Sequence, residues 1–212
     1  MTANRDIAIS SIVETAEFSS FLEESTVLRR GFYARPAVEV ARDCLGKILV
    51  HGKTAGRIVE VEAYLGVGDR AAHSWRGITE RTRVIFGEPG HAYVYFIYGM
   101  YECLNIVAEP EGEAGCVLIR ALEPVAGIPT MRRRRPKAKG LEDLASGPGK
   151  LTLAMGITRK LNGADLTKSA LQVRRLKDEP SLEVEVTPRI GITHCVDWPL
   201  RFLIANNRFV SR

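Results

Sequence analysis

Two carboxylates separated by a single residue are the first candidates for chemistry in this sequence. Glu60 and Glu62 lie in the apolar run Arg57–Tyr64. Side chains alternate along a strand, so Glu60, Glu62 and Tyr64 are expected on one face. The alternation places three apolar side chains on the other face: Val59, Val61 and Ala63. Burying a charge is costly without a partner. The two acids are therefore either the solvated face of a half-exposed sheet or a site with a general base beside an aromatic ring.

An arginine inside another apolar run could supply that partner. Arg120 lies within Cys116–Leu122, where packing alone seldom requires an arginine. Glu60 and Glu62 are the obvious acids to pair with it. Asn105 adds a further polar group among apolar neighbours on a nearby predicted strand.

His73 lies among small residues in a polar stretch, next to Ser74. Its ring is either the wall of a pocket or a loop histidine with a local hydrogen bond. Ser74 lacks the GxSxG context of a catalytic serine, so a serine triad is not predicted.

Four of the six tyrosines fall between Tyr93 and Tyr101. Tyrosine-rich runs, which here include Tyr95, are typical of strands. Tyr98 is different, because it comes at the expected turn. A rigid, exposed aromatic tip on a basic protein can wedge between nucleic-acid bases. The alternative is an ordinary core tyrosine.

A strand-rich scaffold is needed to position these groups. The patterns predict strands over residues 47–51, 56–64, 92–98, 101–107, 116–122, 171–174, 182–187 and 200–204. Helices are predicted from Pro36 to Leu45, burying Val38, and over Leu151–Ile157, with Ser146 as N-cap. Short connections between 92–98, 101–107 and 116–122 indicate an antiparallel meander. Residues 66–90 are predicted to form a long functional loop, and residues 132–140 a basic linker.

Composition bounds the class of protein. The 212 residues are 45% hydrophobic, with 30 basic and 25 acidic side chains and a net charge of +5. This predicts one globular domain over residues 27–212, preceded by a loosely ordered lead-in over residues 1–26 with one helix at Glu17–Glu24. No apolar run suits a membrane span or a signal peptide, so a cytoplasmic protein is expected. The pI near 9.1 hints at a polyanionic partner.

The cysteines and histidines are dispersed along the chain. No CxxC, HExxH or Walker A pattern occurs, so neither a metal nor a cofactor is predicted. The four cysteines are expected to be reduced and in the core.

Seven stretches, taken in order, resemble the mammalian-type 3-methyladenine, or alkyladenine, DNA glycosylase family. They are Leu45–Lys47, Gly56–Gly66, Ala71–Ser74, Tyr93–Tyr101, Cys103–Asn105, Val117–Pro124 and Ser146–Leu151. Each stretch is weak alone, but the ordered set is specific and spans most of residues 30–205. The resemblance implies an α+β fold: a single mixed domain with a curved antiparallel, barrel-like sheet, surrounding helices and a protruding β-hairpin.

The resemblance also implies roles for individual residues. Glu62 is similar to the general base that activates water, and Arg120 to its partner, with the main chain near Ile190 helping. Tyr98 is similar to the hairpin residue that fills the gap left by a flipped nucleotide. Three rings resemble the walls that sandwich the flipped base: Tyr64, His73 and Tyr95. Asn105 resembles the residue that obstructs the amino group of normal guanine.

The implied activity is that of a monofunctional DNA glycosylase. It would act as a monomer on double-stranded DNA containing damaged purines, such as 3-methyladenine, hypoxanthine or ethenoadenine, in the cytoplasm and nucleoid of a bacterium. Cationic alkylated bases leave readily and attract aromatic rings. Neutral bases such as hypoxanthine need protonation help that the sequence does not reveal. A strand-cutting lyase needs an amine nucleophile, and no lysine is among the matched pocket positions.

Two rival interpretations stay open. One is a non-catalytic module that binds lesions without cleaving them, and the other is an unrelated enzyme whose basic charge is incidental. The segment Arg81–Phe86 also departs from the family pattern: Thr82 stands where asparagine is more usual, and Val84-Ile85 where Gly-Met is. The pocket floor or a DNA contact is therefore expected to differ here.

Overall fold

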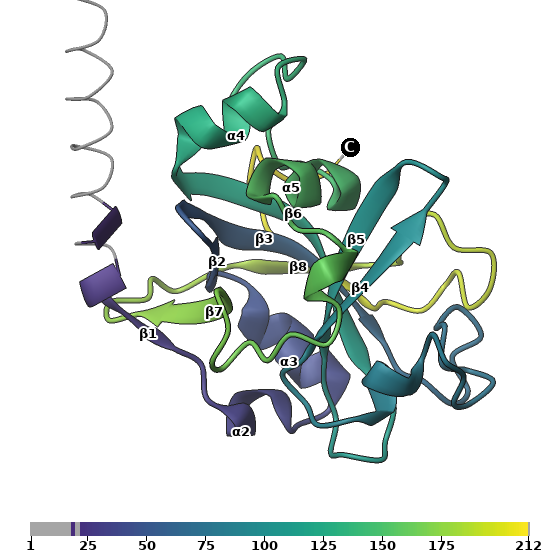
Figure 1. Cartoon of the computed structure of the whole chain (residues 1–212). Helices are drawn as coiled ribbons and strands as arrows, with labels where there is room; N and C mark the ends of the chain where they lie inside the picture. The colour runs from purple at the N-terminus through teal and green to yellow at the C-terminus, as the bar shows by residue number, and fades with distance from the viewer. Residues whose placement is uncertain (1–17, 20–21, 212) are drawn as a thin grey trace, which may run out of the picture.

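Nine antiparallel strands form the framework of the computed structural model, which describes residues 18–19 and 22–211 (Figure 1). The strands are β1 (Ser25–Val27), β2 (Ile48–His51), β3 (Thr54–Tyr64), β4 (Ala92–Ile97), β5 (Tyr101–Val107), β6 (Cys116–Ala126), β7 (Leu171–Leu176), β8 (Val184–Thr187) and β9 (Arg201–Ile204). The order across the sheet is β1-β7-β2-β3-β6-β5-β4, and β9 pairs with both β3 and β8. The predicted α+β class, the meander β4-β5-β6 and the hairpin are confirmed. The predicted barrel-like core is an open sheet, not closed into a barrel.

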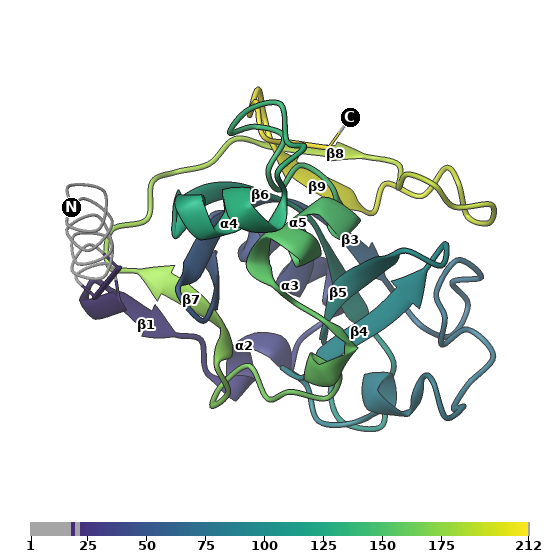
Figure 2. The ribbon, with the colours of Figure 1, turned by 45° about the horizontal axis from the view of Figure 1, so that its top comes forward.

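Four α-helices accompany the sheet within the described residues. They are α2 (Arg30–Tyr33), α3 (Ala37–Cys44), α4 (Ile128–Arg134) and α5 (Pro148–Met155), and short 3-10 turns cover Arg83–Phe86 and Arg159–Leu161. Figure 2 shows the sheet curving around α3, with α4 and α5 beside β6. None of these helices has the length and apolar character needed to cross a membrane.

The helix starts differ in detail from the predictions. Pro36 is the N-cap of α3, and the buried face of the helix carries Val40 and Ala41 in place of Val38. Ser146 is not the N-cap of α5. Gly147 takes that position with φ 154°, because Pro148 already occupies the first helical turn, where its fixed φ and missing N–H are tolerated.

The two central strands carry the main core. β3 and β6 are eleven residues long and nearly wholly buried. Leu49, Val61 and Ile119 from the strands pack with Ala41 of α3 and Leu151 of α5 in one apolar cluster. A sheet covered on this scale cannot leave Glu60 and Glu62 on a solvated face, and both are fully buried.

A register shift interrupts the pairing of β3 with β6 beside these acids. Glu60 pairs with Ala121 and Val61 with Ile119, so Arg120 is an extra residue on β6. Such a bulge re-aims the extra side chain. Arg120 turns toward the two acids, which positions a cation between strands that are otherwise apolar.

A second shift, between Ile58 and Glu60, makes Val59 the extra residue on β3. The prediction that Val59 shares a face with Val61 is therefore wrong. Val59 packs in a separate small cluster with Phe209, whereas Val61 belongs to the main core. Regular alternation fails at a bulge because the inserted residue reverses the facing of the side chains on one side of it.

The basic stretch is more ordered than a linker. Residues 132–134 form the last turn of α4, where Arg134 donates to the Ala154 carbonyl at 2.9 Å. Arg135 donates to the Asp143 and Leu144 carbonyls. The predicted helix at Glu17–Glu24 lies largely outside the described residues. Within the predicted lead-in, Ser25 and Thr26 belong to β1, which pairs with β7.

Candidate active site

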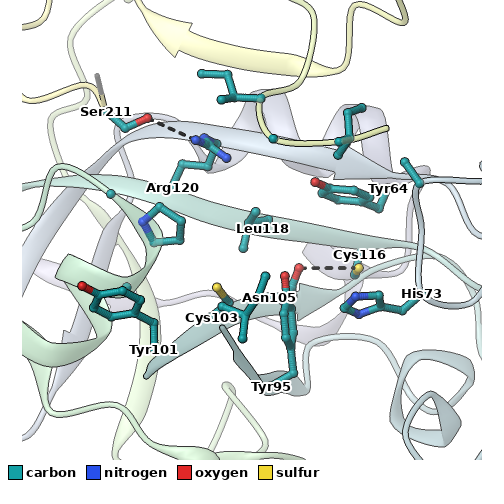
Figure 3. A pocket seen from close by; sticks show the side chains of 18 of the residues that line it. Tyr64, His73, Tyr95, Tyr101, Cys103, Asn105, Cys116, Leu118, Arg120 and Ser211 are labelled. Carbon is teal, nitrogen blue, oxygen red and sulfur yellow. Dashed lines mark hydrogen bonds between the residues drawn. The ribbon is translucent and has the colours of Figure 1, made fainter. Parts of the chain in front are cut away.

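A cavity of about 600 Å³ opens between the sheet, the long loop 66–90, the start of α5 and the connection from β8 to β9. Every predicted site residue except Glu62 lines it, namely Tyr64, His73, Tyr95, Tyr98, Asn105 and Arg120. Figure 3 shows Tyr64 and Arg120 on one side, with Tyr95, His73 and Asn105 opposite. The described lining contains Arg70, Arg120 and Lys150 but no acidic side chain. Arg120 and Lys150 are paired with acids that lie outside the lining.

Glu62 lies directly behind this lining and is fully buried. Its Oε1 accepts a 2.7 Å hydrogen bond from the Ile190 amide and lies 3.1 Å from an Arg120 nitrogen. Its Oε2 accepts a 2.9 Å hydrogen bond from the Tyr64 hydroxyl. All three partners line the cavity, so one layer of residues separates the carboxylate from the cavity.

Glu60 is held more tightly and is also absent from the lining. Its Oε1 accepts hydrogen bonds from Arg120 Nε at 2.9 Å, Arg201 Nε at 2.8 Å and the Ser211 hydroxyl at 2.8 Å. The Ser211 amide donates to Oε2 at 2.6 Å. Burial alone would raise the pKa of Glu60, but the Ser211 amide and the two guanidinium groups hold it below its usual range. Glu60 is therefore a structural anion.

Arg120 bridges the two acids, as the sequence predicts. Its Nε contacts Glu60, another nitrogen contacts Glu62, and a third donates to the Ser211 hydroxyl at 3.3 Å. Burial alone would lower the pKa of Arg120, but Glu62 and Glu60 raise it above its usual value. The cation is thus permanent, and it lies between the two buried acids.

A second buried ion pair was missed by the sequence reasoning. Arg189 donates two hydrogen bonds to the Asp69 carboxylate, at 2.6 and 2.8 Å, and both side chains are fully buried. Arg189 also donates to the Ala63 carbonyl at 3.0 Å, and its guanidinium lies 4.5 Å from the centre of the Tyr64 ring. The pair joins the loop after β3 to the segment that presents the Ile190 amide. No spacing signals it, because 120 residues separate the partners.

His73 is brought into the cavity wall by a network around its ring. The ring centre lies 4.6 Å from that of Tyr95, edge to face. Nδ1 is 2.9 Å from the Tyr93 hydroxyl, and Nε2 is 3.3 Å from an Arg81 nitrogen. The packed surroundings of the ring, and then the Arg81 charge, lower the pKa of His73 to about 4. The imidazole is therefore neutral at physiological pH.

Asn105 is buried with its amide fixed from both ends. Its Nδ2 donates to the Tyr93 carbonyl at 3.3 Å, and its Oδ1 lies 3.8 Å from Cys116 Sγ (Figure 3). Cys116 and Cys103 also line the cavity. The four cysteines are free as expected, and Cys195 alone among them is only partly buried.

Tyr98 stands at the tip of the β4–β5 hairpin, which projects from the sheet in Figure 1. Its side chain is 76% exposed, and its φ is +53°, followed by +67° at Gly99. Two consecutive left-handed residues are typical of a tight hairpin turn. Met100 beside it is also exposed, so the tip presents apolar surface to solvent.

The connection from β8 to β9 is the largest part of the cavity that was not predicted. Residues 190–194 line one side, although the sequence pointed only to the main chain near Ile190. On the side of the cavity formed by the start of α5, a glycine of Ser146–Lys150 allows close packing. A Cβ at Gly149 would lie 2.7 Å from the Tyr101 ring, so only glycine lets α5 approach the hairpin this closely.

Lys150 is an amine at the cavity, although no lysine was among the matched pocket positions. It lines the cavity, but its amine lies 2.6 Å from Asp143 Oδ1. The hydrogen bond from Lys150 is the main cause that lowers the pKa of Asp143. An ammonium committed to an acid is a poor nucleophile. Within the described residues, no group of three or more histidine, cysteine or acidic side chains could hold a metal ion.

Known proteins match this chain over most of its length. A family model described as methylpurine-DNA glycosylase (MPG) matches residues 31–208. A relative from Methanoculleus marisnigri, named "Putative 3-methyladenine DNA glycosylase", is 54% identical over 191 residues, covering 87% of this chain and 98% of the relative. Relatives with the same name from Methanocella arvoryzae and Alkaliphilus oremlandii are each 50% identical and cover 88% and 87% of this chain, and 96% and 98% of their own lengths.

The chain belongs to the methylpurine-DNA glycosylase family. It is a DNA glycosylase, a hydrolase that acts on the N-glycosidic bond, and DNA is its substrate. The family resemblance seen in the sequence is thus confirmed.

Proposed function

We propose that this protein is a monofunctional glycosylase that flips damaged purines out of duplex DNA and releases them by water attack, leaving an abasic site. The observation that carries the proposal is Glu62, buried with Arg120 directly behind a cavity walled by aromatic rings. Its preferred bases are alkylated purines such as 3-methyladenine, with hypoxanthine and ethenoadenine as further candidates. It acts as a monomer, through the domain of residues 27–212.

The cavity suits a flipped purine in size and chemistry. About 600 Å³ lies within the usual range for small-molecule sites. Tyr64 faces Tyr95 and His73 across the cavity, so a base between them is stacked on both faces (Figure 3). Rings of this kind favour cationic, alkylated bases by cation–π attraction. Asn105, which lines the same cavity, is proposed to obstruct the amino group of guanine.

Glu62 is the proposed general base. The oxygen of a water molecule bonds to C1′ of the sugar, the bond from C1′ to the base nitrogen breaks, and its electron pair leaves with the base. Glu62 takes the proton from the water and stabilises the oxocarbenium-like sugar. Arg120 and the Ile190 amide hold the carboxylate in place, at 3.1 and 2.7 Å. Because Glu62 is behind the lining, water reaches it only when one of its contacts at the cavity opens.

The hairpin and the basic rim are proposed to hold the duplex. Tyr98 fills the gap left by the flipped nucleotide, since it is exposed and fixed by a tight turn. Arg70, which lines the cavity, is proposed to contact a phosphate. Contacts of this kind weaken with added salt, because binding releases condensed counterions.

One observation favours a second candidate function. Glu62 has no exposed surface and both of its oxygens are held by Tyr64, Ile190 and Arg120, as would suit a module that binds lesions without cleaving them. This alternative predicts tight lesion binding with no base release.

The test is base release from duplex DNA under single-turnover conditions, with one 3-methyladenine substrate and one hypoxanthine substrate. Products are divided and half are treated with alkali. Strand breaks that need alkali establish a monofunctional glycosylase, and the faster substrate begins to define specificity. Tight lesion binding without release supports the non-catalytic module. Breaks without alkali contradict the monofunctional assignment and point to Lys150, the amine at the cavity.

A further inference from the structure

The proposed mechanism leaves one chemical requirement unmet. A cationic methylated purine departs as a neutral base, whereas a neutral purine such as hypoxanthine departs with negative charge. A hydrogen-bond donor aimed at the bound base would stabilise that charge. The cavity lining therefore needs a donor that is not already committed to a protein acceptor. This inference rests on the proposed function.

Tyr93 on β4 is such a donor. It lines the cavity, although only 2% of the residue is exposed. Its hydroxyl oxygen lies 2.9 Å from His73 Nδ1 and 3.1 Å from Arg81 Nε. Another Arg81 nitrogen lies 3.3 Å from His73 Nε2. The three side chains form a closed ring of contacts at the cavity wall.

The protons in this ring can be placed from the chemistry of its members. A guanidinium only donates hydrogen bonds, so His73 Nε2 must accept from Arg81. A neutral imidazole carries one proton, which therefore sits on Nδ1 and is donated to the Tyr93 oxygen. Arg81 Nε donates to the same oxygen. The Tyr93 oxygen thus accepts twice, and its own proton has no acceptor among residues 18–19 and 22–211.

The cavity is the direction left for that proton. Elsewhere the Tyr93 ring packs with Ile85, Val107 and Ala114, which carry no side-chain acceptor. Tyr95 packs against the same cluster, but its hydroxyl makes no hydrogen bond with that of Tyr93 within the described residues. The contrast with Tyr64 is direct, because the Tyr64 hydroxyl is committed to Glu62. Two incoming N–H groups, one of them charged, also polarise the Tyr93 hydroxyl and strengthen it as a donor.

We propose that the Tyr93 hydroxyl donates a hydrogen bond to the flipped base and selectively promotes the release of neutral purines. The proton stays on Tyr93, since the hydrogen bond stabilises the charge that the base acquires as its bond to C1′ breaks. Arg81 acts through Tyr93 and His73 and is a positioning residue. It lies in the segment 81–86, where the sequence departs from the family pattern.

The first test is Tyr93→Phe, which keeps the ring and removes the hydroxyl. Single-turnover release of hypoxanthine is expected to slow by about 10–100-fold, the lower part of the range seen when one transition-state donor is removed. Release of 3-methyladenine is expected to stay within about threefold, because that base leaves neutral. The matched control is Tyr33→Phe, which removes a buried, unpartnered hydroxyl away from the cavity lining and should change neither rate.

A second variant covers the case in which Tyr93→Phe folds poorly. Arg81→Met alters an exposed residue and frees the imidazole to carry its proton on Nε2. Tyr93 can then turn its own proton onto Nδ1, and the cavity loses the donor although the hydroxyl remains. The same selective slowing of hypoxanthine release is expected, with 15N chemical shifts of the His73 imidazole reporting the change of tautomer.

Three results would overturn the inference. They are equal slowing for both bases, no slowing for either, and a parent enzyme that releases 3-methyladenine but no neutral purine. A parent enzyme that releases neither base is a different outcome, because it removes the proposed function itself.

Discussion

The cavity floor, meaning the buried cluster of Glu60, Glu62 and Arg120, and the tip of the β4–β5 hairpin differ in how their key residues are held. At the floor, Glu60 and Glu62 are fully buried and share Arg120, and donors from distant segments complete their contacts. At the tip, Tyr98 is 76% exposed and is positioned only by the local turn. A charged group that must work out of water needs many fixed partners. A ring proposed to enter DNA, by contrast, has to be free of fixed contacts with its own protein.

This difference predicts that substitutions at the floor alter the reaction or the fold, while substitutions at the tip alter only the grip on DNA. Three substitutions test that division, from the largest expected effect to the smallest.

Glu62→Gln should keep lesion binding but lose most base release. The glutamine amide cannot take a proton from water, and a general base contributes about 10²–10⁴-fold in rate. Single-turnover release and equilibrium binding to lesion duplex measure the two properties separately. The matched control is Glu60→Gln, which should reduce stability more and the rate less, since Glu60 is proposed to be structural. Parental rates in Glu62→Gln would remove Glu62 from the role of base.

Arg120→Met should destabilise the protein, because it leaves two buried carboxylates without their shared cation. Loss of one partner from a buried ion cluster costs about 3–5 kcal/mol of the free energy of unfolding. Urea unfolding measures it. Arg208→Met is the control at the exposed pair with Glu142, where a loss of no more than about 1 kcal/mol is expected. Equal losses at both sites would show that the floor is not the tightly coupled cluster described here.

Tyr98→Ala should weaken binding to lesion duplex by about 1–3 kcal/mol, the value of one base–aromatic stack. The free energy of unfolding should hardly change, because the ring packs on little of the protein. Fluorescence anisotropy with labelled duplex gives the affinity, and Tyr98→Phe should restore it. If affinity is unchanged in Tyr98→Ala, the wedge role belongs to another residue of the tip.

Much of this architecture could be predicted from local patterns. The strands around Glu62, Tyr95 and Asn105 follow from alternation and β-branched content, and the turn at Tyr98 from Gly99. The pairing of Arg120 with both acids follows from the cost of burying charge. These signals lie within a few residues of the feature they predict, so one sequence is enough to find them.

Other features depend on contacts that local patterns do not encode. The bulge at Arg120 is a property of two strands in register, and Val59 was misplaced for the same reason. The Arg189–Asp69 pair and the wall formed by residues 190–194 arise from distant segments that meet only in the fold. Ser146 was a reasonable N-cap by residue type, but Gly147 took the position because of where Pro148 falls.

The donors of the buried acids carry a consequence for the order of synthesis. The Ile190 amide holds Glu62, while Arg201 and Ser211 hold Glu60. A growing chain makes both acids, the aromatic walls and the hairpin long before it makes these three partners. Glu62 therefore gains its last donor only after residue 190 has left the ribosome, and Glu60 gains its own only after residue 211. A chain released before residue 190 would lack the amide that holds Glu62. The order of synthesis thus leaves the buried acid cluster incomplete until almost all of the protein described here exists.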